Sequence, residues 1–257
     1  KDGKLAVMGR EKKDRSLIIL LPEKTNDKSL AMTSSFSSMV VAGQYIASIR
    51  DTARYAGIVS ELAEAGRTIM GQYSGDLETL CSEPFQRAVF LGSNTLFGCA
   101  KECHMKLQEE TDGKVVGKFD TFLGLRHGPE AVVHDDTIVV YLMSEDPLVH
   151  RYELDLMNGV KGKGIGMKKI AVCKKADEQT KAAADLVIEH GRNIPDDYQS
   201  PAYVIIGQAL GVFKSLAFGL KPDSPSEAGV ITRVVQGVKI YDHPSFHANG
   251  SLKVIAG

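Results

Sequence analysis

Short apolar segments alternate with helical segments from residue 87 onward, and this alternation limits the possible folds more than any other feature. The apolar runs of strand length cover residues 87–91, 115–122, 137–142, 169–173 and 186–189. Runs of this length separated by helices are typical of parallel strands joined by crossover helices. The sequence therefore predicts an α/β fold, a doubly wound parallel sheet with helices on both faces.

The other elements follow from the same patterns. Residues 96–108 and 148–159 have helical spacing, and a long helix is expected over 197–220. Before the alternating region we expect a strand at 16–21, helices at 36–47 and 52–71, and a linker or short helix at 73–84. A catalytic turn is expected at 125–129 and an edge strand at 237–241.

The composition excludes several classes of protein. The chain has 257 residues, 43% of them hydrophobic, and a net charge of −1, which does not fit a nucleic-acid binder. A local excess of lysine at residues 161–175 is explained by a solvated loop, since no aromatic residues are interleaved. No apolar run approaches the roughly 20 residues that span a bilayer.

Cysteine usage and the start of the chain place further limits. The four cysteines show no metal-binding spacing, so no metal and a reduced, cytoplasmic setting are expected. Cys99 and Cys103 lie one helical turn apart, and we expect them to be buried. The start has neither a signal peptide nor an initiator Met, so a processed or excised chain is expected.

A first candidate site lies where the strand at 87–91 ends. Gly92 lets the backbone approach a ligand, and Ser93 and Asn94 open the next helix, whose free N–H groups can bind an anion. The motif is shorter than GxGxxG, and an ordinary strand-to-helix turn explains it equally well. We keep these three residues as candidate substrate contacts.

A second candidate site lies on the helix that follows. Glu102, Lys106 and Glu109 have i, i+4 and i+7 spacing, which places them on one face. A carboxylate and an ammonium on one stripe suit acid–base chemistry. A solvent-exposed ladder of ion pairs is the competing interpretation.

Two further groups of polar residues are candidates. His127 stands beside Arg126 before Gly128 and Pro129, and an imidazole can move protons in both directions near neutral pH. A solvated or structural histidine is the alternative. Thr33, Ser34 and Ser35 offer hydroxyls that could hold a phosphate, although helix capping also accounts for them. His134, His150 and His190 have no partner at ligand spacing and are expected at the surface.

Several segments resemble the sugar isomerase (SIS) domain family, and more narrowly its tagatose-6-phosphate ketose/aldose isomerase branch. These segments are DKSLAMTSSF (27–36), FLGS (90–93), MKLQEET (105–111), LRHGPE (125–130), RYELDL (151–156) and GLKPDSPS (219–226). Full-length members of the branch carry two such domains in tandem. The resemblance implies that residues 1–50 are the remnant of a first SIS domain, 51–84 a linker helix, 85–242 a complete second domain and 243–257 a tail.

The resemblance also implies an activity. Members of the branch act as galactosamine-6-phosphate deaminase/isomerases, which need neither a metal nor another cofactor and yield tagatose 6-phosphate and ammonia. By similarity to the more distant glucosamine-6-phosphate synthase isomerase domain, Glu109 would move the C2 proton and Lys106 would assist at the reacting carbons. His127 would open the sugar ring from a neighbouring subunit, which implies a homo-oligomer. That relative's C-terminal catalytic lysine has no clear match, since Arg233 or Gln236 stands in its region.

Two other interpretations stay open. SIS domains also occur in regulators, so a non-catalytic module that senses a sugar phosphate is one alternative. An inactive, truncated deaminase is the other. The partner in every case is a phosphorylated amino sugar, without nucleic acid or membrane.

Overall fold

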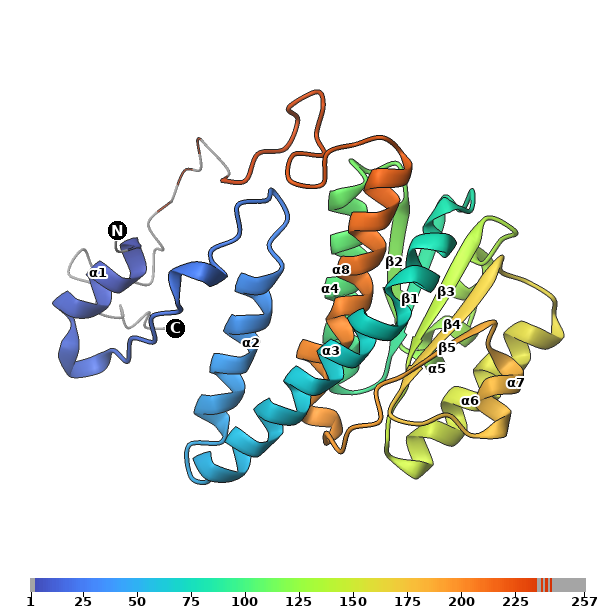
Figure 1. The fold of residues 1–257 in the computed structure, drawn as a ribbon, viewed down its shortest axis with the longest axis horizontal. Coiled ribbons are helices and arrows are strands. Elements are labelled where there is room, and N and C mark those ends of the chain that lie inside the picture. The colour runs from blue at the N-terminus through green and yellow to red at the C-terminus, as the bar shows by residue number, and fades with distance from the viewer. Residues whose placement is uncertain (1–2, 235–236, 238, 240, 242–257) are drawn as a thin grey trace, which may run out of the picture.

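Five parallel strands form the central sheet of the computed structural model, which describes residues 3–234, 237, 239 and 241 (Figure 1). The strands are β1 (Arg87–Gly92), β2 (Val116–Asp120), β3 (Thr137–Leu142), β4 (Lys168–Cys173) and β5 (Leu186–Glu189). Their order is β2-β1-β3-β4-β5, and every neighbouring pair is parallel. This order is one of the two common orders of doubly wound sheets, so the predicted fold class is confirmed.

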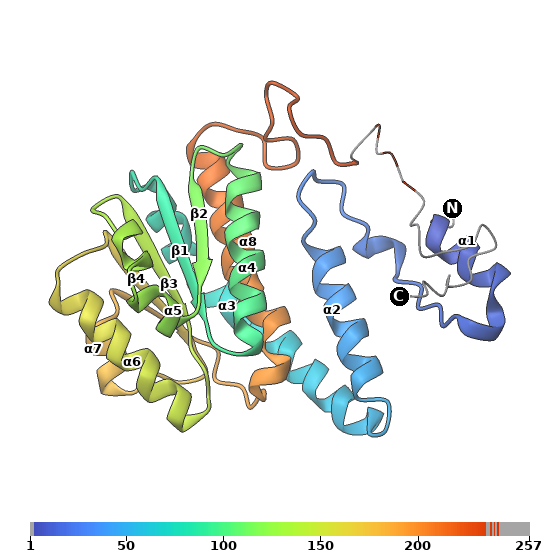
Figure 2. The same cartoon turned by 180° about the vertical axis from the view of Figure 1, so that it is seen from behind.

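Helices cover both faces of this sheet (Figures 1 and 2). One face carries α3 (Thr52–Ser82), α4 (Thr95–Glu110) and α8 (Ser200–Ala217), and the other carries α5 (Phe122–Arg126), α6 (Pro147–Gly162) and α7 (Glu178–Ala183). The central strand β3 is buried along its whole length, and its alternate residues enter two separate cores. Ile138 and Val140 pack on the α3–α4–α8 side, whereas Val139 and Tyr141 pack on the other side.

The N-terminal part lies beside the sheet domain (Figure 1). It contains α1 (Lys4–Glu11), α2 (Ser34–Ala47) and the 3₁₀ turns η1 (Lys13–Arg15) and η2 (Glu23–Thr25). Helix α2 contacts α8 and α3. Two further 3₁₀ turns, η3 (Pro129–Val132) and η4 (Asp196–Tyr198), lie within the sheet domain.

The strand expected at residues 16–21 is wrong. The segment is irregular, and the side chains of Leu17 and Leu20 are 79% and 59% exposed. Apolar residues form a strand only where a neighbouring strand accepts their backbone hydrogen bonds. None of the five strands that the described residues form lies beside this segment.

Several predicted boundaries also shift. Helix α3 continues through the expected linker at 73–84 to Ser82, because Leu77 and Leu80 extend its buried stripe past Gly71. The expected turn at 125–129 is instead the end of α5 followed by η3, with Thr121 capping α5 through the N–H of Gly124 at 2.9 Å. The predictions did not include α1 or α7. In the expected edge strand at 237–241, residues 238 and 240 lie outside the described residues.

A buried lysine fixes the end of α3 against α8. The Lys214 Nζ donates hydrogen bonds to the carbonyl oxygens of Cys81 and Glu83, at 3.1 and 2.5 Å. It also lies 4.0 and 4.8 Å from the ring centroids of Phe85 and Phe218. A cation at the carboxyl end of a helix is stabilised by the helix dipole and by the last free carbonyls. Lys214 therefore anchors the helix that joins the N-terminal part to the sheet.

Helices α4 and α8 approach each other closely at Gly207. A Cβ atom at this position would lie 2.6 Å from the Cys103 Cβ and would also overlap the Cys103 backbone. Both thiols of α4, Cys99 and Cys103, are buried in this core, as the sequence predicted. The glycine is thus required by packing and not by backbone conformation.

We expect Gly207→Ala to destabilise the protein by about 1–3 kcal/mol, because one helix must shift to make room for the methyl group. The matched control is Gly98→Ala on exposed α4 surface, where nothing lies within 4 Å of a built Cβ. There we expect a gain of about 0.5–1 kcal/mol. Urea unfolding of both variants measures the difference, and equal stabilities would contradict the close approach.

The same interface buries a carboxyl group that has an unpaired oxygen. Glu110 is 2% exposed, its Oε2 has no hydrogen-bond partner among the described residues, and its side chain packs against Gly211 of α8. Burial raises the pKa of Glu110 to about 7, although the charge of Lys106 opposes the rise. The folded protein thus holds a proton that the unfolded chain, with a glutamate pKa near 4.3, has already released.

The neutral Glu110 carboxyl therefore makes a pH-dependent contribution to the free energy of unfolding. This contribution is complete below about pH 4.3, where the carboxyl is protonated in both states, and it is lost as the pH rises towards about 7. We expect Glu110→Gln, which cannot ionise, to match the parent at pH 4.5 and to exceed its stability at pH 8 by roughly 1–3 kcal/mol. Denaturant unfolding at both pH values measures this, with the exposed Glu78→Gln as control. A pH-independent difference would show that the Glu110 carboxyl ionises normally.

Candidate functional site

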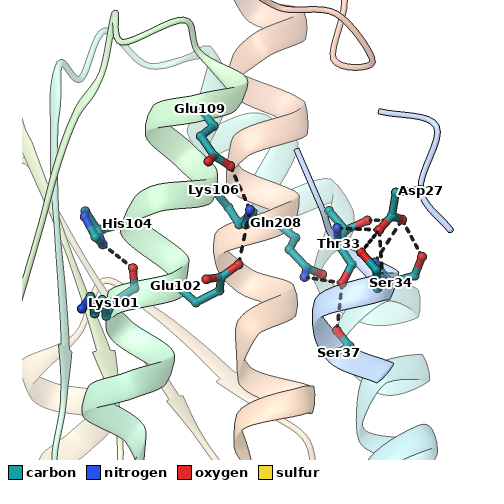
Figure 3. A network of polar contacts seen from close by, with 11 residues as sticks. Asp27, Thr33, Ser34, Ser37, Lys101, Glu102, His104, Lys106, Glu109 and Gln208 are labelled. Carbon is teal, nitrogen blue, oxygen red and sulfur yellow. Dashed lines mark hydrogen bonds and ion pairs between the residues drawn. The ribbon is translucent and has the colours of Figure 1, made fainter. Parts of the chain in front are cut away.

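The stripe on α4 forms a buried cluster of charges (Figure 3). The Lys106 Nζ lies 2.8 Å from the Glu109 Oε2 and 3.3 Å from the Glu102 Oε1. The side chains of Lys106 and Glu102 are only 4% and 10% exposed, whereas that of Glu109 is 33% exposed. The competing interpretation, a solvent-exposed ladder of ion pairs, is therefore wrong for Lys106 and Glu102. Glu109 is the member of the cluster that an incoming molecule can reach.

The electrostatics of the cluster keep Lys106 charged. Burial lowers the pKa of Lys106, but the hydrogen bond to Glu109 and the charge of Glu102 outweigh burial and raise it overall. Burial raises the pKa of Glu102, and Lys106 opposes that rise. Lys106 can thus donate a hydrogen bond to a developing negative charge but cannot act as a base at neutral pH.

A cavity of about 670 Å³ opens at this cluster. Its wall is formed by Lys106 and Glu109 of α4, by Leu30 and Met32 before α2, and by Val230, Ile231, Thr232 and Arg233 of the C-terminal segment. The volume is in the range of small-molecule sites. An ammonium, a guanidinium and a carboxylate line one cavity, which suits a small, negatively charged, polar ligand.

Sequence reasoning did not assign several of these wall residues. Leu30 and Met32 belong to the DKSLAMTSSF segment, but their role is visible only because the Leu30 N–H donates to the Asp223 carbonyl at 3.1 Å. Arg233 donates to the Asn26 Oδ1 at 2.7 Å, which brings the C-terminal segment to the same place. About 200 residues separate the partners of each pair in the sequence, so local patterns could not pair them.

The hydroxyl-rich start of α2 already has an anion. The carboxylate of Asp27 accepts hydrogen bonds from the backbone N–H and the hydroxyl of each of Thr33, Ser34 and Ser35 (Figure 3). Partial burial opposes ionisation of Asp27, but the bonds from Ser34 and Ser35 hold its pKa well below the usual range. The three predicted phosphate contacts are thus occupied by a carboxylate of the chain.

In the turn after β1, the Ser93 hydroxyl likewise has a carboxylate of the chain as its partner. The Ser93 Oγ donates to the Glu153 Oε1 at 2.6 Å, and the other Glu153 oxygen accepts the Ser144 N–H at 2.9 Å. A Cβ at Gly92 would overlap the carbonyl of Leu96, so the glycine is explained by packing. Gly92, Ser93 and Asn94 lie at the start of α4, roughly 18 Å along the helix from Lys106. The structure therefore does not bring this turn to the cavity.

His127 and Arg126 lie on the other face of the sheet. Both are exposed. Arg126 ends α5 and His127 follows it, and α5 packs on α6, whereas Glu109 belongs to α4 on the opposite face (Figure 2). Gly128, at φ 113°, permits the sharp turn after the histidine. Within one chain the structure does not bring His127 to Glu109. The expectation that both reach one site can hold only between subunits.

Of the three histidines expected at the surface, one is buried. His134 is exposed, and His150 lies 3.3 Å from the Asp177 Oδ2. His190 is 2% exposed, so its prediction is wrong. His190 directly follows β5, and its ring packs against Tyr203 of α8, with the ring centroids 5.6 Å apart.

The described residues contain neither a cluster of metal ligands nor a membrane-spanning helix. No group of three or more His, Cys, Asp or Glu side chains there is arranged to hold a metal ion. No helix in that part of the chain has the length and apolar character that crossing a membrane requires.

Comparison of the sequence with curated proteins gives relatives of one kind. The sequence matches no family model. It is 32% identical over 237 residues to the D-galactosamine-6-phosphate deaminase AgaS of Escherichia coli, covering 89% of this chain and 59% of that protein. The chain thus spans about three fifths of the length of this curated relative.

Solved structures agree with the sequence match. A protein of Clostridium novyi NT assigned as a tagatose-6-phosphate ketose/aldose isomerase superposes with a TM-score of 0.88 at 31% identity, over 94% of this chain and 62% of that one. The tagatose-6-phosphate ketose/aldose isomerase of Escherichia coli gives 0.78 at 29% identity, over 91% and 62%. The expected resemblance is confirmed in sequence and in fold: the chain belongs to the sugar isomerase (SIS) domain family.

Proposed function

We propose that this chain provides the catalytic cluster of an amino-sugar-phosphate isomerase/deaminase, which converts galactosamine 6-phosphate to tagatose 6-phosphate and ammonia. The observation that carries the proposal is Glu109, a partly exposed carboxylate on a cavity wall that is held by a buried ammonium. The names of the relatives support the substrate class.

The geometry suits a proton shift between adjacent carbons. In the open-chain sugar, Glu109 removes the C2 proton while Lys106 donates a hydrogen bond to the oxygen on C1, where negative charge develops. Return of the proton to C1 converts the enolamine to a C2 imine. Water then adds to the imine carbon and ammonia leaves, so the product is the ketose. Each step uses only acid–base groups and water.

Arg233 is our proposed contact for the phosphate. Arg233 lines the cavity together with Lys106 and Glu109, and its guanidinium suits bidentate binding of phosphate oxygens. Thr33, Ser34 and Ser35 are poorer candidates, because Asp27 already accepts their hydrogen bonds. The Asp27 carboxylate would also repel a phosphate at that position.

Ring opening requires a second subunit in this proposal. His127 is exposed on the face of the sheet opposite Glu109, so it can serve only the site of a neighbouring chain. The same arrangement would place Arg126 at the rim of that site. A homo-oligomer is therefore part of the proposal.

Replacement of the base tests the assignment. We expect Glu109→Gln to lower kcat for ammonia release from galactosamine 6-phosphate about 10²–10⁴-fold, with KM nearly unchanged, because the amide cannot accept the proton. The control is Glu178→Gln, whose side chain is 91% exposed on α7. An unchanged rate for Glu109→Gln would remove Glu109 as the base.

Mixing of inactive variants tests the shared site. We expect Glu109→Gln and His127→Asn each to be inactive, and an unfolded and refolded equimolar mixture to recover about a quarter of the parent activity per chain, as random dimers predict. In such a mixed dimer, one site receives an intact glutamate and an intact histidine.

The matched control mixes Glu109→Gln with Lys106→Met, which lie on the same helix and therefore in the same half of the site. That mixture should stay inactive. Recovery in both mixtures, or in neither, would contradict a site shared in this way.

A further inference from the structure

We propose that the chain has a second anion-binding site, at the carboxyl ends of β4 and β5, for a small dianion such as a phosphomonoester. A cavity of about 440 Å³ lies there. It is lined by Thr68, Gln72 and Tyr73 of α3 and by Lys174, Lys175, Glu189, His190, Gly191 and Arg192 after the two strands. The proposal is independent of the function proposed above.

The position is one where sheets of this kind bind ligands. Parallel strands end at a common edge, and ligands of open α/β sheets lie beyond that edge. Lys106 and Glu109 lie towards the far end of α4, which starts at this edge and runs away from it. The two cavities therefore belong to different parts of the molecule and share no lining residue.

The lysine excess at residues 161–175 divides into two groups. Lys163 pairs with Glu130 at 2.6 Å, Lys169 pairs with Asp185 at 3.3 Å, and Lys161 donates to the Ala182 carbonyl. By contrast, Lys174 and Lys175 form no ion pair within 4.0 Å among the described residues, and both line the cavity. A solvated loop therefore explains only part of the excess.

The carboxylates around the cavity have other partners. Glu189 accepts the Ala176 N–H at 2.7 Å, and Glu145 accepts the Lys174 N–H at 3.2 Å. Glu64 pairs with Arg67 and reaches Arg192 only at 4.0 Å. The cavity wall itself carries the cations of Lys174, Lys175 and Arg192 against the single carboxylate of Glu189, which favours an anion.

A neutral, buried histidine fixes the cationic residues in place. Burial, together with the charges of Lys174 and Arg192, lowers the pKa of His190 to about 4. The His190 Nδ1 accepts the Arg192 N–H at 3.2 Å, so its proton is on Nε2, 3.4 Å from the Tyr203 hydroxyl. The Gly191 N–H donates to the Lys174 carbonyl at 2.9 Å. These bonds hold Lys174 and Arg192 side by side before any ligand binds.

A ligand here would connect α3 to the sheet. The Tyr73 hydroxyl accepts the Glu189 N–H at 3.2 Å, which leaves its own proton free to donate to an anion. Thr68 and Gln72 add further polar groups from the same helix. Binding would therefore stabilise the contact between α3 and the ends of β4 and β5.

The test is a titration with inorganic phosphate at constant ionic strength, followed by amide ¹H–¹⁵N spectra of the whole chain. A Lys106→Met/Arg233→Gln background removes the cations of the first cavity. In that background we expect the amides of Lys174, Gly191 and Arg192 to shift together. We expect an added Lys174→Ala substitution to weaken phosphate binding about tenfold, since a charged hydrogen bond is lost.

The matched control is Lys168→Ala, an exposed lysine at the other end of β4, which should bind phosphate like the background. Arg192→Gln, which keeps the backbone bond to His190, should weaken binding by a similar factor. Equal affinities in the Lys174 and Lys168 variants would overturn the proposal. Phosphate-induced amide shifts that are confined to the first cavity in the unsubstituted chain would also overturn it. Failure of either kind leaves the Glu109 assignment untouched, because that rests on ammonia release.

Discussion

The buried ammonium of Lys106 is the constraint on which the candidate site depends. Removing a charge from water costs several kcal/mol unless partners compensate, and here two carboxylates do so. They are not equivalent, because Glu102 is enclosed with the lysine whereas Glu109 reaches the cavity. If Glu109 takes up a proton, Lys106 keeps Glu102 as its counter-ion. The cluster can therefore lose one negative charge during a reaction without leaving a buried cation unpaired.

The sequence showed where hydrogen-bond donors that suit an anion lie, but not which anion they bind. A helix start with three hydroxyl residues was a candidate for holding a phosphate, and a strand-to-helix turn was a candidate for binding an anion. In the structure each holds a carboxylate of the chain itself, Asp27 in one case and Glu153 in the other. Donors of this kind bind any oxyanion, and a sequence does not show which oxyanion is near. Only contacts between distant residues decide that.

Prediction of the fold was limited in the same way, by contacts between distant residues. Periodicity predicted the five parallel strands, because each apolar run had to pair with its neighbours inside two helical layers. It failed at residues 16–21, where an equally apolar run has no strand beside it. The i, i+4, i+7 spacing placed Glu102, Lys106 and Glu109 on one stripe, but their burial depends on packing that spacing does not describe. Arg233 and Leu30 reach the cavity through contacts across most of the chain, beyond any local pattern.

The topology gives a reason for a shared site. A helix that follows a strand in a doubly wound sheet lies on one face or the other, and α4 and α5 lie on opposite faces (Figure 2). A glutamate on the first and a histidine after the second cannot meet through the sheet. However, β2 is an edge strand, so α5 follows it at the border of the sheet, where Leu123 is an exposed apolar side chain. A border position is one that a neighbouring chain can approach. If both residues act on one sugar, the fold itself then requires that they come from two copies of the chain.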